Sequence, residues 1–499
     1  MFQLGCRPAE HVPEVDAHLA ADMDSGTPSD SETGCGRSGS EDEDGTPSVN
    51  PAPPPAAGPL DAVLHSDAIG DTLYSERGLL RTLMALNAAV PRYLGLERSA
   101  GEGGDAEGDG AGESPEDGGG DEPPLMELDA ELEEQLCQLW DMTAERAVAE
   151  FAAASGLLEV VWPLLDRSPC PRLLEIVSGA LANCAGHGAK ALPGGADTAA
   201  AAVGLLIAGS RGDAPVLRET LRLAQAAACA QPEPERLLRA LAGWLPLLVD
   251  VLRGALFAPL LRQALGLLAA VAELPDRRAW WLGELAAVRE LPAAVLEGLA
   301  QLVGGDGAGV TAAEALDCCR DSLLLLAEVE AMEGAEKPDT DSWVAPVPRL
   351  VRGVCEARRA AAASADPRLA CCLLWLAAPA LRLAWCDDTL ASLLRFCEAA
   401  QRVSGDEDLP SDAEPAAEEP AEAPMEDGGA EARAELDQRL GATAAFLARQ
   451  CVGSVTRFVV CSRRRREAAL LMAVLDRAAP ELADGLRLPP PADGGTHHL

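Results

Sequence analysis

Fifteen cysteines and six histidines are the side chains of this 499-residue chain that could bind a metal ion or act as nucleophiles. No Cys-x-x-Cys pair occurs, and the adjacent pairs Cys318–Cys319 and Cys371–Cys372 lie inside Leu-rich runs. Four of the six histidines lie near the chain ends, and neither His65 nor His187 has ligand-type spacing to a cysteine. The pattern predicts no metal site, and reduced thiols that pack as small apolar side chains.

The sequence motifs of common enzyme classes are missing. The only two lysines, Lys190 and Lys337, do not complete a G-x-x-x-x-G-K loop, which removes the usual phosphate cradle. No Gly-rich run fits G-x-G-x-x-G, no G-x-S-x-G is present, and acid pairs such as Asp387-Asp388 lack a partner histidine. We therefore expect a non-enzymatic protein without a cofactor.

Ser38 and Ser40 are candidate phosphorylation sites near the N-terminus. They precede the acidic run Glu41–Asp44, a pattern typical of acid-directed kinases, and phosphorylation would add charge to an already acidic tail. A plain solubilising tail is the alternative interpretation of the same composition.

The chain has a single run of four basic residues: Arg463, Arg464, Arg465 and Arg466. A short basic run can serve as a nuclear-import signal. Apolar residues flank this run on both sides, however, and nearly every basic residue of the chain is arginine. A solvated helix start is therefore the alternative interpretation.

Acidic residues are concentrated in three segments. Residues 1–50 carry 11 acidic and 2 basic side chains, residues 101–134 carry 14 and 0, and residues 406–427 carry 10 and 0, which together hold −33 of the net charge of −40. Such segments cannot bury enough apolar surface to fold by themselves. The acidic surface disfavours nucleic-acid binding. The sequence has no 18-residue apolar run, so we expect no membrane span. The N-terminus lacks basic residues followed by an apolar run, so we expect no secretory signal.

The rest of the chain has the periodicity of α-helices. Apolar residues recur every three or four positions in stripes such as Leu79/Leu83/Leu86/Val90, Leu128/Leu132/Leu136/Leu139, Leu174/Val177/Leu181/Cys184 and Leu316/Cys319/Leu323/Leu326. Ser75 can cap the first of these helices. Prolines at intervals of 12 to 19 residues between Pro215 and Pro292 mark short helices and their turns. No sustained two-residue alternation favours a strand.

Many short helices without strands predict an all-α, armadillo/HEAT-like α-solenoid, because a single compact core stops growing well below this length. The helical segments recur at about 40 residues, inside the armadillo/HEAT range. The predicted organisation is a disordered acidic tail at 1–69, a first helix within 70–100, an acidic insert at 101–126, helical repeats at 127–402, an acidic linker at 403–430, capping helices at 431–488 and a tail at 489–499.

Three clusters of residues resemble one protein family. They are Gly70-Asp-Thr-Leu-Tyr-Ser75, the segment from Leu128 to Met142, and Ser168–Ile176 with Gly179-Ala-Leu-Ala-Asn-Cys-Ala185. Together they are similar to the serum amyloid A-like 1 family, and Ala483–Pro489 adds a weaker likeness. The resemblance implies a mostly helical, armadillo-type nuclear protein that promotes cell proliferation, notably of synovial fibroblasts under pro-inflammatory stimulation. It implies no catalytic residue and no cofactor.

Asn183 is a candidate protein-binding residue. Its segment is similar to the last helix of an armadillo repeat, where an asparagine reads the backbone of an extended partner along a concave groove. A carboxamide suits that role because it offers one acceptor and two donors to a peptide plane. The alternative is an asparagine that closes a helix through a neighbouring backbone group.

Trp140 is the second candidate, because tryptophan is enriched in binding hot spots; a core anchor is the alternative. The adjacent Trp280 and Trp281 are both expected to pack between repeats, although consecutive helical residues face different directions.

The expected function is that of a nuclear scaffold, with the cytoplasm as a second location, that binds other proteins along its solenoid surface. Nucleic acid and membrane are not expected partners, and the sequence leaves the oligomeric state open. A second hypothesis is an acidic, chaperone-like protein whose segments 101–134 and 406–427 bind histones or other basic partners, with strong dependence on salt.

Overall fold

The computed structural model describes residues 67–95, 126–189, 213–230, 235–305, 309–332, 339–402, 428–461 and 463–487. Across these ranges the chain forms 19 α-helices and no strand, so the predicted all-α solenoid is confirmed. Ser38 and Ser40 lie outside the described residues, as do residues 1–66, 101–125 and 403–427, which make up nearly all of the predicted acidic tail, insert and linker.

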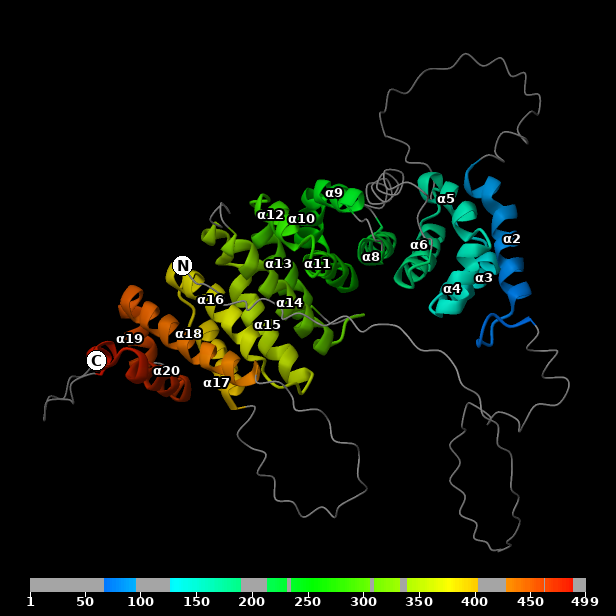
Figure 1. Ribbon diagram of the computed structural model, residues 1–499. Coiled ribbons are helices and arrows are strands. Elements are labelled where there is room, and N and C mark those ends of the chain that lie inside the picture. Colours follow the sequence, from blue (N-terminus) through cyan, green and yellow to red (C-terminus); the bar gives the residue numbers. More distant parts are fainter. Residues whose placement is uncertain are drawn as a thin grey trace, which may run out of the picture. The chain divides into compact units, whose positions relative to one another are not determined.

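Most consecutive helices are joined by short connections (Figure 1); the longer connections include residues 96–125, 190–212 and 403–427, which lie outside the described residues. In chain order they are α2 (Glu76–Tyr93), α3 (Ala130–Met142), α4 (Arg146–Ala154), α5 (Leu157–Arg167), α6 (Pro171–Gly186), α8 (Ala214–Ala230), α9 (Glu235–Gly243), α10 (Leu245–Gly254), α11 (Ala258–Ala272), α12 (Arg278–Ala286), α13 (Leu291–Gly304), α14 (Ala312–Ala331), the 3-10 helix η3 (Thr340–Trp343), α15 (Pro346–Ala360), α16 (Pro367–Leu383), α17 (Asp387–Arg402), α18 (Gly428–Gln450), α19 (Val452–Cys461), α20 (Arg465–Ala478) and α21 (Pro480–Leu486).

Two series of helices pack side by side in chain order. The first layer runs α3, α6, α8, α11, α14, α16 and α18, and each of these helices packs on the next. The second layer runs α10, α13, α15 and α17 in the same manner. Packing between successive members of a layer is the arrangement of a solenoid.

Among the described residues, the repeats that begin with α3, α8 and α11 contain three helices each. The 9-residue helices α4, α9 and α12 each follow a first-layer helix and precede a longer helix that returns the chain toward the first layer. First-layer helices begin at Ala130, Pro171, Ala214 and Ala258, which are 41, 43 and 44 residues apart. This spacing lies inside the armadillo/HEAT range used for the prediction.

Helix starts follow the punctuation of the sequence. The hydroxyl of Ser75 accepts a hydrogen bond from the backbone N–H of Gly78 at 3.2 Å, which confirms the predicted cap of α2. Pro246, Pro259 and Pro292 occupy the first turns of their helices, where the missing N–H leaves no helical bond unmade.

The predicted apolar stripes face the core. In α6, Val177, Leu181 and Cys184 are buried, and Leu174 is half-buried. The expectation for the paired tryptophans is wrong for one of them. Trp281 is fully buried and donates from Nε1 to the carbonyl of Leu268 at 3.0 Å, whereas the side chain of Trp280 turns toward the surface and is 37% exposed.

None of the described helices is both long and apolar enough to cross a membrane by itself. Only the pair Arg146–Ala154 and Leu157–Leu165, bent by 78° at its break, reaches that length and hydropathy jointly.

Candidate functional site: a groove along the first layer

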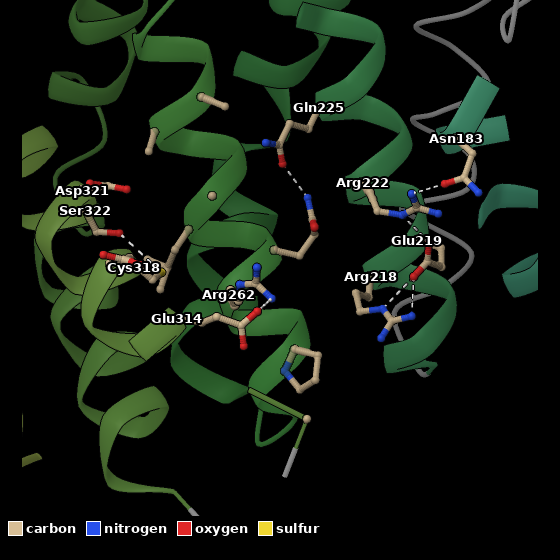
Figure 2. Close-up of a pocket in the computed structure, with 18 of the residues that line it drawn as sticks. Asn183, Arg218, Glu219, Arg222, Gln225, Arg262, Glu314, Cys318, Asp321 and Ser322 are labelled. Atoms are coloured by element: carbon tan, nitrogen blue, oxygen red, sulfur yellow. Dashed lines mark hydrogen bonds and ion pairs between the residues drawn. The ribbon is translucent and has the colours of Figure 1, made fainter. Parts of the chain in front are cut away.

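A groove of about 870 Å³ runs along five consecutive helices of the first layer, from α3 through α6, α8 and α11 to α14. Figure 2 shows its walls, with Asn183 toward one end and Asp321 and Ser322 toward the other. We call this feature the first-layer groove. It is lined by Trp140, Asp141, Ala144, Asn183, Arg218, Glu219, Arg222, Gln225, Pro259, Arg262, Gln263, Leu265, Gly266, Ala269, Ala270, Glu273, Gly309, Glu314, Asp317, Cys318, Asp321 and Ser322.

Trp140 lies in the last turn of α3, half-buried, and forms part of one end of the groove. Its indole ring rests on the backbone of Gly179 in α6, so closely that an added Cβ at position 179 would come within 3.0 Å of the ring. A glycine is therefore required for this contact between the two helices. Trp140 therefore packs one part of its ring on α6 and also lines the groove.

Asn183 lies one helical turn beyond Gly179 and joins α3 to α8. Its Nδ2 donates to the carbonyl oxygen of Trp140 at 3.0 Å and to Oγ1 of Thr143 at 3.2 Å. Its Oδ1 accepts from Nη1 of Arg222 at 2.6 Å. The carboxamide thus satisfies the C-terminal end of α3 and orients an arginine of α8. Recognition of a partner backbone by Asn183 stays a prediction, and donation from Nδ2 to a partner requires exchange of one of its two bonds.

A buried carboxylate organises the wall contributed by α8. The side chain of Glu219 is 2% exposed and accepts from Nε of Arg218 at 2.7 Å and from Nε of Arg222 at 2.6 Å. Nη2 of Arg222 also donates to the carbonyl oxygen of Gly179 at 2.8 Å. Because a buried carboxylate is stable only when it is paired and hydrogen-bonded, Glu219 holds both guanidinium groups against the wall.

The middle of the groove lies between α8 and α11. Nε2 of Gln263 donates to Oε1 of Gln225 at 2.6 Å across the two helices, as Figure 2 shows. Gly266 lies one turn further along α11, and a Cβ built there meets only Oε1 of Gln225, at 3.9 Å. The floor at Gly266 is therefore open space.

The far wall begins at the N-terminus of α14. Thr311 and Glu314 form a capping box, in which Oε2 of Glu314 accepts from the backbone N–H of Thr311 at 2.8 Å and from its hydroxyl at 2.9 Å. These bonds, with Nη1 of Arg262 at 2.9 Å from Oε1, hold the pKa of the Glu314 carboxyl below its usual value.

The sequence-predicted residues fall at two separate places. Trp140 and Asn183 come together in the first-layer groove, whereas the arginine run lies at the start of α20. There Arg464 pairs with Asp388, and Nη2 of Arg466 lies 2.9 Å from Oε2 of Glu398. The two acidic residues belong to α17. Arg463 and Arg465 are exposed.

Sequence reasoning missed the α8 wall of the groove. Its signal was the spacing of Arg218, Arg222 and Gln225 at i, i+4 and i+7, which places a polar stripe on an otherwise apolar helix. Nothing in the sequence indicates that Arg222 meets Asn183, 39 positions away, because that contact depends on how α6 and α8 pack.

The thiol in the groove is poorly reactive. Burial raises the pKa of Cys318 to about 11, so its thiolate is scarce at neutral pH. Among the described residues, no three His, Cys, Asp or Glu side chains gather as a metal ion requires.

Fold and groove together define an α-solenoid with a polar channel along one layer. No protein-family model matches the chain. The chain is 32% identical to "Protein saal1" of Danio rerio over 192 residues, which are 37% of this chain and 36% of that protein. It is also 32% identical to "Protein SAAL1" of Mus musculus over 139 residues (27% and 25%) and to that of Homo sapiens over 123 residues (25% and 22%).

The resemblance to serum amyloid A-like 1 proteins that the sequence predicted is thus confirmed as a similarity. The chain spans between about a quarter and a third of the length of the curated relatives it matches.

Proposed function

We propose that this chain is a non-enzymatic protein-interaction scaffold whose first-layer groove holds an extended segment of a partner protein. The observation that carries the proposal is the groove itself, which is continuous over five helices and is walled by side chains already fixed in hydrogen bonds. Solenoids offer such long surfaces to extended partners. Ordered walls also reduce the entropy that binding would cost.

The chemistry of the groove walls supports the proposed non-enzymatic role. The arginines that line the groove are committed to carboxylates, and its thiol has a high pKa. These paired arginines and this buried thiol supply neither a nucleophile nor a general base.

A steric block tests the proposal. Gly266→Trp fills the open floor of α11, and Gly283→Trp is its matched control, because Gly283 is an exposed helical glycine of α12 with no atom within 4 Å of a built Cβ. We expect affinity capture from nuclear extract, read by quantitative mass spectrometry, to lose partners about tenfold with Gly266→Trp only. Equal partner sets for the wild type and both variants, at matched melting temperatures, would contradict the proposal.

We also propose a nuclear location and a role in promoting cell proliferation, including that of synovial fibroblasts under pro-inflammatory stimulation. The support is the resemblance to serum amyloid A-like 1 proteins. The test is depletion of the protein from such fibroblasts, followed by expression of the wild type, Gly266→Trp or Gly283→Trp. We expect the wild type and Gly283→Trp to restore proliferation. Equal rescue by Gly266→Trp would separate proliferation from the groove.

A further inference from the structure

We propose that the occupant of the first-layer groove is a basic, extended peptide segment, with arginine or lysine side chains directed at the carboxylates of α3, α11 and α14. This inference rests on the proposed function and names the chemistry of the partner. Six carboxylates and three guanidinium groups line the groove.

The three arginines are not available to an acidic partner. Arg218 and Arg222 share the buried carboxylate of Glu219, and Arg262 pairs with Glu314. Arg222 is bound further, to Asn183 and to the carbonyl of Gly179. A partner carboxylate would have to displace these short internal bonds. The exchange of one carboxylate for another at a paired arginine gives little binding free energy.

Two carboxylates of the groove, in contrast, are open to a partner. Asp141 and Glu273 are exposed and make no hydrogen bond or ion pair with another described side chain. Both lie at the C-terminal ends of helices: Asp141 is next to the last residue of α3, and Glu273 is the C-cap of α11. The partial negative charge of a helix C-terminus adds to each carboxylate and favours a cation there.

The far wall carries two further acids. Asp317 and Asp321 of α14 flank Arg320, which pairs with both at 3.1 and 3.0 Å, so one guanidinium serves two carboxylates. The excess of negative charge therefore lies at Asp141, at Glu273 and at the α14 wall, whereas the α8 wall carries two arginines and one glutamate. Trp140, next to Asp141, adds an aromatic ring, and a ring beside a carboxylate suits an arginine or lysine head group.

The size of the groove limits the length of the segment. Four steps of about 9 Å between neighbouring helices, at about 3.3 Å per extended residue, give a segment of about eleven residues. We therefore infer a short linear segment rather than the face of a folded domain.

The experiment uses the full chain and three fluorescein-labelled ten-residue peptides, in which serine alternates with arginine, glutamate or alanine. The groove variant is Asp141→Asn, Glu273→Gln and Asp321→Asn. The control variant removes the same charge from exposed acids that do not line the groove: Asp71→Asn, Asp250→Asn and Glu356→Gln. Fluorescence anisotropy at 150 mM salt gives the dissociation constants.

We expect the arginine peptide to bind the wild type and the control variant alike, and the groove variant about tenfold more weakly. The glutamate and alanine peptides should bind none of the three. Equal binding of the arginine peptide to the control and groove variants would overturn the inference and assign the binding to the acidic segments. If Gly266→Trp still abolishes partner capture in that case, the proposed function stands and only the basic occupant is wrong.

Discussion

The indole of Trp140 lies against the backbone of Gly179, so that α3 and α6 approach each other through a ring and a residue without a side chain. The same two helices are joined one turn further on by Asn183. One end of the first-layer groove is therefore set by how closely these helices can pack.

Gly179→Ala should destabilise the protein. The added methyl group meets the Trp140 ring at less than 3.0 Å, and overpacking of this kind costs about 1–3 kcal/mol, more than the 0.5–1 kcal/mol that alanine contributes inside a helix. Urea unfolding measures the difference. Gly283→Ala, where the new methyl group meets nothing, should leave the stability unchanged or raise it. A Gly179→Ala protein as stable as the wild type would show that the ring moves freely.

Asn183→Ala should lower the free energy of unfolding by about 1–3 kcal/mol, because Nη1 of Arg222 loses its acceptor and the Trp140 carbonyl keeps only the hydroxyl of Thr143 as a donor. Asn87→Ala is the matched control, since Asn87 is exposed on α2. A combined Asn183→Ala and Arg222→Ala variant should cost less than the sum of the two changes. Additive costs would mean that the bond between the two side chains contributes nothing to stability.

The arginine run can be divided by its contacts. Arg463→Ala with Arg465→Ala removes two exposed charges and leaves the pairs of Arg464 and Arg466 with α17 in place. We expect a fluorescent fusion of this double variant to keep the distribution of the wild type, because the contacts of Arg464 and Arg466 with α17 favour a helix start over an import signal. Accumulation of the double variant in the cytoplasm, at an unchanged melting temperature, would identify the run as an import signal.

The capping box predicts a pH dependence with a definite sign. The pKa of Glu314 is lowered in the folded protein, first by the N–H and hydroxyl of Thr311, so its contribution to stability is present above the unfolded pKa near 4.5. The contribution is lost as the pH falls through the lower, folded value. Glu314→Gln should therefore melt below the wild type at pH 7, and the gap should close under acidic conditions. A gap that is constant from pH 7 to pH 3 would contradict this.

Cysteine reactivity should separate buried from exposed thiols. Burial raises the pKa of Cys184 to about 12 and that of Cys372 to about 12. Partial burial raises the pKa of Cys229 as well, but its side chain is exposed. At pH 8 we expect iodoacetamide to modify Cys229 first and to leave Cys184 and Cys372 intact until the chain is unfolded in guanidinium. Peptide mass spectrometry reads each site. Early modification of Cys184 would show that α6 opens readily.

The helices could be predicted well because buried apolar residues recur every three or four positions along a helix, and this spacing is visible in the sequence. The stripe ending at Cys184 and the cap at Ser75 are local features, and both were found as expected. The walls of the groove could be predicted only in part. Trp140 and Asn183 were selected by residue type, but their contact with each other, and with Arg222, depends on the packing angle between helices far apart in sequence.

Trp280 is a second example of a feature that depends on helix packing and cannot be predicted from the local sequence. Its residue type favours burial, yet adjacent positions of α12 face different directions and only Trp281 can point at the core. Which of the two turns inward depends on the rotation of α12 against its neighbours.

The packing of each first-layer helix on the next gives the protein a graded response to mechanical load. A force applied between the two ends of a chain that is built in this manner peels off one repeat at a time, because the described first-layer helices pack mainly on their neighbours in the series. Optical-tweezer traces should then show a series of small extensions, with α3, α6 and α8 leaving together because Trp140, Asn183 and Arg222 join them.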